Sequence, residues 1–175
     1  MNRDSSDTKG TNRFSEVLDR MIMGIGHVVM WVNVLLIVVI IVQVVLRYGF
    51  GRGMVALEEL QWHLYAIGIM IGASYAQVLD THIRVDIIHA RLSEKWKLRW
   101  DLFGIIVLLL PFIFVVFHQS LAFVGESFRL AEKSDAPLGL PWRWIIKAVL
   151  PISFGLLGVA TLSRAARIIT RLKRV

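Results

Sequence analysis

Four long apolar stretches constrain what this chain can fold into, at about residues 22–46, 59–79, 102–123 and 144–162. A helix rises about 1.5 Å per residue, so about 20 apolar residues cover the roughly 30 Å of a bilayer's hydrocarbon core. The hydrophobic share of 56% exceeds the roughly 45–50% of a soluble domain. The sequence therefore predicts an all-α membrane protein with four transmembrane helices.

The segments around these stretches complete the predicted organisation. Residues 1–20 are polar and predict a cytoplasmic tail, residues 21–165 form the four-helix domain, and residues 166–175 form a basic cytoplasmic tail. The first stretch is longer than the roughly 7–15 apolar residues of a cleavable signal peptide, so we expect it to be retained. Between the second and third helices, the amphipathic residues 83–100 predict an interfacial helix, and Pro111 predicts a kink in the third helix.

The cationic residues divide unevenly between the two ends of the predicted helices. Lys and Arg number 4, 5 and 5 in the N-terminal tail, residues 80–101 and the C-terminal tail, against 2 and 3 in residues 47–59 and 124–143. The positive-inside rule therefore places both termini in the cytoplasm. Because the net charge of +7 comes from clusters beside apolar stretches, it favours phospholipid headgroups over nucleic acid. Tryptophans fit interfacial belts, with Trp62, Trp142 and Trp144 at the outer boundary and Trp96 and Trp100 at the inner one.

The centres of the four stretches contain no Asp, Glu, Lys or Arg. Ion-coupled carriers generally place such a group within the membrane, so we expect no transported substrate to contact this chain. The same lack disfavours a self-sufficient small carrier. The absence of cysteine excludes thiolate metal sites and a thiol nucleophile. The sequence accordingly predicts no enzyme activity, no cofactor and no metal site.

Two histidines keep a second function open. His63 and His118 lie at similar depth near the outer ends of the second and third helices, and two such imidazoles can ligate a b-type haem. This alternative is a haem- or quinone-binding membrane anchor of a respiratory oxidoreductase. Otherwise each histidine hydrogen-bonds to a neighbouring helix or to interfacial water.

The start of the second helix also has two interpretations. Glu58 and Glu59 either stabilise the helix N-terminus or, with His63 one turn after Glu59, present a polar face to Arg47, Arg52 or a partner subunit. Two such ligands alone make a poor metal site.

Small and charged residues further along the chain suggest packing contacts. Gly68 and Gly72 form a Gly-x-x-x-Gly step that lets helices approach closely, either within this chain or against another protein. Arg84 and Asp86 are either a solvated surface pair or fix the angle between the second helix and the interfacial helix.

Three motifs together resemble a known family. They are Glu-Glu-Leu-Gln-Trp-His-Leu-Tyr-Ala-Ile-Gly at 58–68, Asp-Thr-His-Ile-Arg-Val-Asp at 80–86, and Gly-Leu-Pro-Trp-Arg-Trp-Ile-Ile-Lys-Ala at 139–148. In order and spacing they resemble the small, DctQ-like membrane subunit of tripartite ATP-independent periplasmic (TRAP) transporters, over about residues 20–165.

The resemblance implies a non-catalytic scaffold subunit of a sodium-coupled transporter for organic acids. Its implied partners are a large, DctM-like membrane subunit, which carries the sodium and substrate sites, and a soluble periplasmic binding protein. The loop at 125–143 would help to dock the binding protein, through Glu126, Arg129 and Glu132. The candidates for contacts with the large subunit or lipid are Glu58, Glu59, His63, Gly68, Gly72, Arg84, Asp86, Trp96, Trp100, Trp142, Arg143, Trp144 and Lys147.

Overall fold

The computed structural model describes residues 4–79 and 93–173, and every element of secondary structure within these ranges is helical. α1 (Asp4–Val44) ends in a π-helical turn, Val45–Gly49, and α2 (Val55–Val78) follows. α4 (Glu94–Phe103) continues through a second π-helical turn, Gly104–Leu109, into α5 (Leu110–Arg129), and α6 spans Arg143–Leu172. The predicted all-α class is confirmed.

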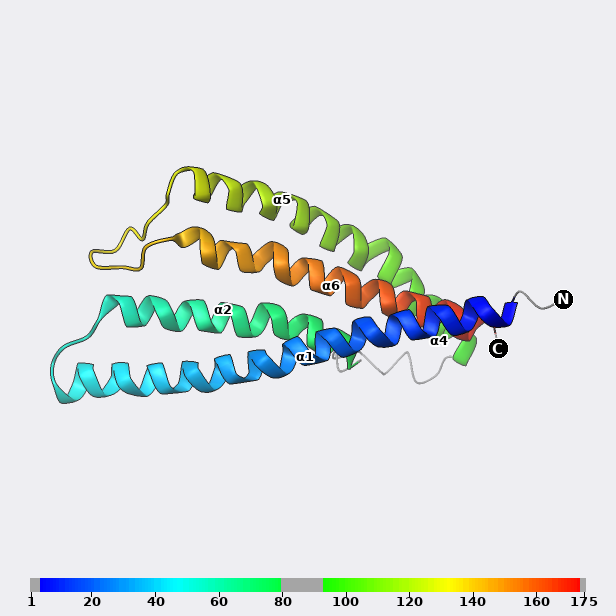
Figure 1. Cartoon of the computed structure of the whole chain (residues 1–175), viewed down its shortest axis with the longest axis horizontal. Coiled ribbons are helices and arrows are strands. Elements are labelled where there is room, and N and C mark those ends of the chain that lie inside the picture. The colour runs from blue at the N-terminus through cyan, green and yellow to red at the C-terminus, as the bar shows by residue number, and fades with distance from the viewer. Residues whose placement is uncertain (1–3, 80–92, 174–175) are drawn as a thin grey trace.

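The helices lie side by side along the long axis of the molecule, in the order α1, α2, α6 and α5 (Figure 1). α2 packs against α1 and α6, whereas α5 packs against α6. The α1–α2 and α5–α6 connections lie at one end of the bundle, which we call the loop end. The first turn of α1 and the last turn of α6 lie at the opposite end, which we call the terminal end. The two ends of the chain thus share one side, and the compartment on that side stays a prediction.

Three helical segments of the described residues are long and apolar enough to cross a membrane: Met23–Gly49, Glu94–Arg129 and Arg143–Leu172. α2 is not among them. Its 24 residues reach about 36 Å, which is sufficient for a bilayer core, but Gln61, His63 and Gln77 lower its hydropathy. The predicted fourth span therefore remains a prediction.

Several helices extend beyond the predicted boundaries, among them α1 and α6. α1 begins at Asp4 and not near residue 21, so the backbone of most of the predicted polar tail is helical. No proline interrupts the chain before residue 50, and a helix need not end where its apolar run begins. α6 continues from the predicted end at 162 to Leu172, because Ala165 and Ile168 pack into an apolar cluster with Ile105 of the second π-helical turn.

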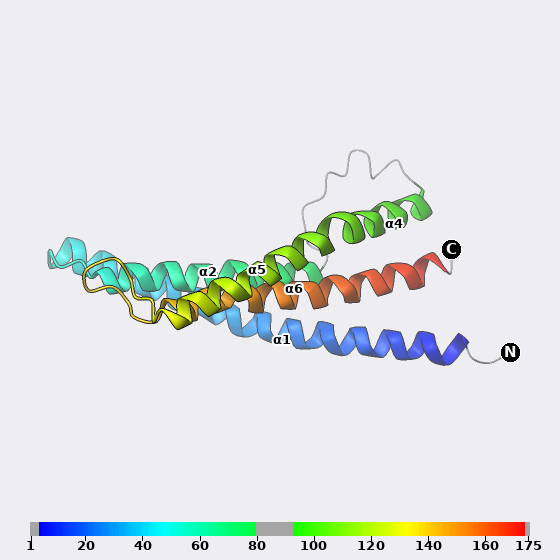
Figure 2. The same cartoon turned by 90° about the horizontal axis from the view of Figure 1, so that it is seen from above.

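The kink predicted at Pro111 stays a prediction, and a π-helical turn, Gly104–Leu109, lies just before this proline. Proline lacks an N–H and its ring displaces the preceding carbonyls, so the local hydrogen-bond pattern changes. Part of the predicted interfacial helix, residues 83–92, lies outside the described residues. Its remaining part belongs to α4, which is continuous with the third helix, packs against α6 and lies on the opposite side of α6 from α1 (Figure 2).

Small polar residues form much of the interface between helices. Ser74, Ser153 and Thr161 are almost completely buried, and the hydroxyl of Ser74 donates a hydrogen bond of 3.1 Å to the backbone carbonyl of Ser153. Without a hydrophobic driving force between helices in lipid, close backbone approach and hydrogen bonds of this kind hold them together. This bond joins α2 to α6 midway along the bundle.

Candidate functional site

Glu59 connects the two helical hairpins at the loop end. Its carboxylate lies in the first turns of α2 and accepts a hydrogen bond from the Ser134 hydroxyl and another, of 2.5 Å, from the Leu140 backbone N–H. Both donors belong to the α5–α6 loop, residues 130–142. Hydrogen bonds to an ionised acceptor are stronger than those between neutral groups. Glu59 therefore fixes this loop against α2.

Glu132 fixes the same loop against α6. Its carboxylate forms an ion pair with Lys147, and a second pair of 3.7 Å with Arg143. Arg143 also pairs with Asp135 at 3.1 Å, and its backbone N–H donates to the Glu132 carbonyl at 3.1 Å. Lys147 lies over the ring of Phe123, 4.0 Å from its centroid. Charged contacts thus hold the loop at the start of α6.

The hydrogen bond from Lys147 lowers the pKa of Glu132 below the ordinary value of a glutamate, and the charge of Arg143 acts in the same direction. A lowered pKa in the folded state means that the contact stabilises the loop at neutral pH. This stabilisation is lost only as the pH falls through the lowered value.

Three residues of the α5–α6 loop have backbone angles that are unusual for residues with a side chain. Ala131, Leu138 and Trp142 have positive φ angles of 47°, 66° and 63°, a region that residues with a side chain seldom occupy. A Cβ added to Gly139 would lie 2.8 Å from Oε1 of Glu59, so glycine is required for this approach. The contacts of Glu59 and Glu132 with the loop hold these conformations in place.

Glu58 has a different set of partners from Glu59. It accepts a hydrogen bond of 3.2 Å from the Gln43 side chain and forms an ion pair of 3.4 Å with Arg47. The Gln43 side-chain oxygen in turn accepts the Met54 N–H at 3.3 Å. Glu58 therefore closes the corner between α1 and α2. Glu58 thus binds side chains of α1, whereas Glu59 binds the α5–α6 loop. Neither interpretation from the sequence assigned separate partners to the two carboxylates.

The two glycines of α2 also differ. A Cβ on Gly68 would lie 2.7 Å from Oδ1 of Asn33, so Gly68 allows α1 and α2 to approach. A Cβ on Gly72 would meet nothing within 4 Å. The close-packing step therefore serves a contact within the chain at Gly68 and leaves open space at Gly72.

The two histidines of the haem alternative do not come together. His63 lines an apolar cavity of about 450 Å³ between α2 and α6, together with Ile67, Trp142 and Val149. His118 is exposed on α5 and stacks with Phe114, with 6.3 Å between ring centroids. α6 lies between α2 and α5 (Figure 1), and among the described residues no group of three or more His, Asp or Glu is arranged to hold a metal ion.

The chain matches a known family over most of its length. A family model described as "Tripartite ATP-independent periplasmic transporters, DctQ component" matches residues 36–171, which is most of the chain. The chain belongs to the DctQ family. No curated protein matches closely enough to add a relative. The resemblance seen in the sequence is confirmed, and DctQ members are components of transporters, not a known family of enzymes.

The match covers both connections at the loop end, and it covers α6 from its first residue to Arg171. Of the candidate contact and docking residues of this DctQ chain, the structure brings Glu59 to the loop at Leu140, and Glu132, Arg143 and Lys147 to each other. Arg84 and Asp86 lie outside the described residues.

The remaining candidate residues are the tryptophans and the exposed ion pair of Glu126 and Arg129. Trp62 and Trp142 at the loop end, and Trp96 and Trp100 near the terminal end, are exposed, whereas Trp144 packs edge-to-face on Phe128 with 5.4 Å between centroids. The interfacial belts stay a prediction. Glu126 and Arg129 form an exposed ion pair of 3.1 Å on the last turn of α5.

Several residues that fix the site had no clear pattern in the sequence. Ser134 is 75 positions from Glu59 in the chain, and Asn33 and Gln43 were notable only as polar residues in an apolar run. An off-centre amide in a membrane helix is a usable clue, since such a group needs a hydrogen-bond partner. Nothing local to Ser134 indicates its contact.

Replacing Glu59 by alanine is expected to release the α5–α6 loop. Ser134 and the Leu140 N–H would lose their common acceptor, so trypsin should cleave at Lys133 several-fold faster. The matched control is Glu58→Ala, which removes a carboxylate bound to α1 and should leave cleavage of the loop unchanged. Equal cleavage rates in the two variants, measured by mass spectrometry of the fragments, would contradict the role assigned to Glu59.

Proposed function

We propose that this chain is the scaffold subunit of a sodium-coupled TRAP transporter for organic acids, embedded in a bacterial inner membrane by four helices with both termini in the cytoplasm. It supports the large, DctM-like membrane subunit and performs no catalysis and no transport of its own. The observation that carries the proposal is the uncharged interior of its apolar helices within a DctQ-family chain. Such helices give structural support, while ion coupling needs charged or polar groups within the membrane.

The exposed faces of the bundle favour a membrane partner. α1 and α5 carry large apolar side chains that this chain alone leaves uncovered, among them Trp31, Ile37, Ile41, Phe112 and Phe114. In a membrane, such faces contact either lipid or another helix. Gly72 adds open space on α2 where a further helix can approach closely.

Co-expression with the large membrane subunit tests the scaffold proposal. We expect the two proteins to purify as one complex and the large subunit to accumulate less when this chain is omitted. Reconstitution of this chain alone into vesicles is expected to give no gradient-driven uptake of an organic acid. Failure to bring down any larger membrane protein, or uptake by the chain alone, would overturn the proposal.

The loop end is the proposed docking face for the periplasmic binding protein. Glu126 and Arg129 are exposed there, whereas Glu132 is occupied by Lys147 and Arg143 within the chain. Opposite charges across an interface chiefly set the rate of association. Charge reversal at Glu126 therefore tests docking without disturbing the loop.

We expect Glu126→Arg to slow uptake by the assembled transporter several-fold at limiting binding protein, with less effect at saturating binding protein. Lys95→Glu, an exposed charge reversal near the terminal end, is the control and should leave uptake unchanged. Initial uptake rates measured over a series of binding-protein concentrations check this. Unchanged rates for Glu126→Arg would remove the docking proposal and leave the scaffold proposal standing.

The haem or quinone anchor remains the second candidate only through the presence of His63 and His118. The separate positions of these residues give it no support beyond the sequence. An absorption spectrum of the purified protein distinguishes the two functions, since a Soret band lost in His63→Ala would favour the anchor.

A further inference from the structure

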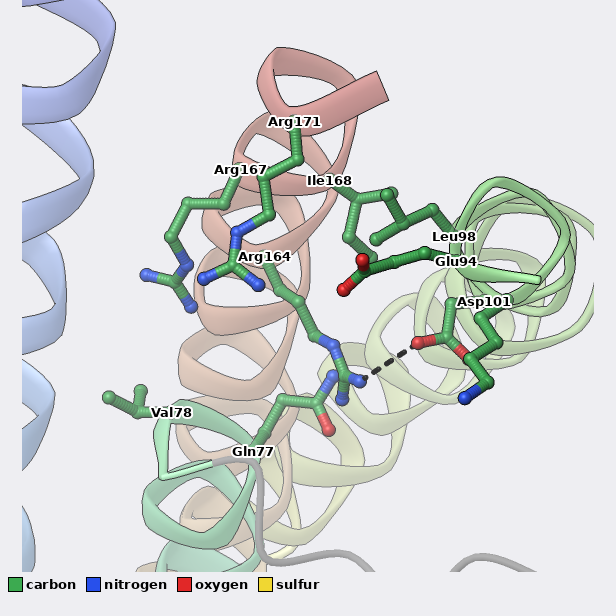
Figure 3. Close-up of a pocket in the computed structure, with 10 residues that line it drawn as sticks. Gln77, Val78, Glu94, Leu98, Asp101, Arg164, Arg167, Ile168 and Arg171 are labelled. Atoms are coloured by element: carbon green, nitrogen blue, oxygen red, sulfur yellow. Dashed lines mark ion pairs between the residues drawn. The ribbon is translucent and has the colours of Figure 1, made fainter. Parts of the chain in front are cut away.

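A charged cavity opens between α2, α4 and α6 at the terminal end (Figure 3). Its volume is about 350 Å³. Charged side chains from two helices line it: Glu94, Lys97 and Asp101 from α4, and Arg164, Arg167 and Arg171 from α6. Among the described lining residues, four cations thus face two carboxylates, and the excess of positive charge favours an anion.

The arginines occupy one side of α6 because they recur at intervals of three and four residues. Figure 3 shows the guanidinium groups of Arg167 and Arg171 close to each other, with that of Arg164 beside Gln77 and Asp101. Arg164 pairs with Asp101 at 3.7 Å, and Arg167 donates to the Ser163 hydroxyl at 3.2 Å. Neighbouring guanidinium groups repel each other, and planar forks of N–H donors match phosphate oxygens.

A second cavity, of about 370 Å³, adjoins the first. The two share Gln77, Asp101 and Arg164. The second cavity is lined mainly by apolar or small residues: Ala73, Trp100, Gly104, Ile105, Leu109 and Leu157. Leu157 lies seven residues before Arg164, or about 10 Å deeper along α6. The combined space is therefore basic near the terminal end and apolar toward the middle of the bundle.

The position of this space along α6 corresponds to a membrane boundary. The 30 residues of α6 reach about 45 Å, whereas the hydrocarbon core is about 30 Å thick. The turns that carry Arg164, Arg167 and Arg171 consequently extend to the headgroup level, and exposed Trp96 and Trp100 on α4 fit the same level.

We propose that the two cavities bind one anionic phospholipid, with its phosphate headgroup at Arg167 and Arg171 and an acyl chain in the apolar cavity beside Gly104. A soluble anion would use only the first cavity, and a neutral lipid would gain nothing from its charge. Basic pockets between membrane helices bind acidic headgroups in this way. The site needs the chain to lie in a membrane but does not depend on its role in a transporter.

Lipid titration of the full chain in detergent tests the site. Phosphatidylglycerol and phosphatidylcholine with identical acyl chains are added, and bound lipid is counted by native mass spectrometry. We expect phosphatidylglycerol to bind several-fold more tightly, and the preference to disappear in the double variant Arg167→Gln/Arg171→Gln. Lys95→Gln removes an exposed cation of α4 that does not line either cavity, and should keep the preference.

Two further arms test the acyl chain and the headgroup separately. Gly104→Leu should weaken binding of both lipids, because a Cβ there meets nothing within 4 Å and the added side chain can occupy the apolar cavity. The control is Gly125→Leu, which is equally open but lies at the far end of α5 and should not weaken binding. Inorganic phosphate at the same concentration should not compete. Competition by phosphate, equal binding of both lipids, or equal loss in Lys95→Gln would overturn the proposal. If the double arginine variant does not fold, Lys97→Gln provides the same test of headgroup charge.

Discussion

Gly26→Ala is expected to destabilise the folded chain, whereas Gly24→Ala, two residues earlier in α1, is expected to leave stability unchanged or raise it. A Cβ at Gly26 would lie 2.8 Å from Cγ of Tyr75 on α2, too close for ordinary packing. The Tyr75 ring is itself in edge-to-face contact with His27, at 6.1 Å between centroids, so it has little room to move. Overpacking of this kind typically costs about 1–3 kcal/mol.

At Gly24 the added Cβ meets nothing within 4 Å. Replacing a helix-interior glycine by alanine typically gains about 0.5–1 kcal/mol. The two variants should therefore shift the thermal unfolding midpoint of the purified chain in opposite directions, as followed by tryptophan fluorescence in detergent. Equal midpoints would mean that α1 and α2 do not approach as closely at this point as the structure shows.

Asp101→Ala is expected to lower stability more than the removal of other charges of α4. The ion pair between Asp101 and Arg164 joins α4 to α6, and the two side chains are only 20% and 13% exposed. Removing one partner of a fully buried pair typically costs about 3–5 kcal/mol, whereas an exposed pair contributes about 0–1 kcal/mol, so the loss for this partly exposed pair should lie between these values. Glu94→Ala, on the exposed first turn of α4, is the control and should cost little.

The double variant Asp101→Ala/Arg164→Leu tests the cause. Both residues have other contacts in the structure, so each single variant measures more than the pair. If the uncompensated charge of Arg164 is the main cost, the double variant should be more stable than Asp101→Ala alone. The cycle compares the chemical unfolding of the unchanged chain, the single variants Asp101→Ala and Arg164→Leu, and the double variant. If the losses of stability in the two single variants simply add in the double variant, the charge of Arg164 is not the main cost.

Hydropathy was sufficient to predict the helices because a membrane span must be long and apolar. It did not predict where they end. α6 continues through Arg164, Arg167 and Arg171, since the small and apolar residues between them pack on α4 while the cations face the cavity. α2 illustrates the opposite case: its polar residues lower its hydropathy although its length suits a span.

The sequence indicated which types of contact the candidate site would contain, but not which residues would form them. A Gly-x-x-x-Gly step indicates close packing but not its partner, and only the structure distinguishes Gly68, which faces Asn33, from open Gly72. The carboxylates before α2 indicated a polar contact, yet the donors for Glu59 come from a loop far along the chain. Long-range pairing of this kind depends on the order of helices in space, which periodicity within one helix does not contain.

The contact of Glu59 with the α5–α6 loop has a mechanical consequence. It ties the α1–α2 and α5–α6 hairpins together at the loop end, whereas at the terminal end α1 and α4 lie on opposite sides of α6 (Figure 2). A neighbouring protein that shifts against this chain would therefore move the two hairpins together at the loop end.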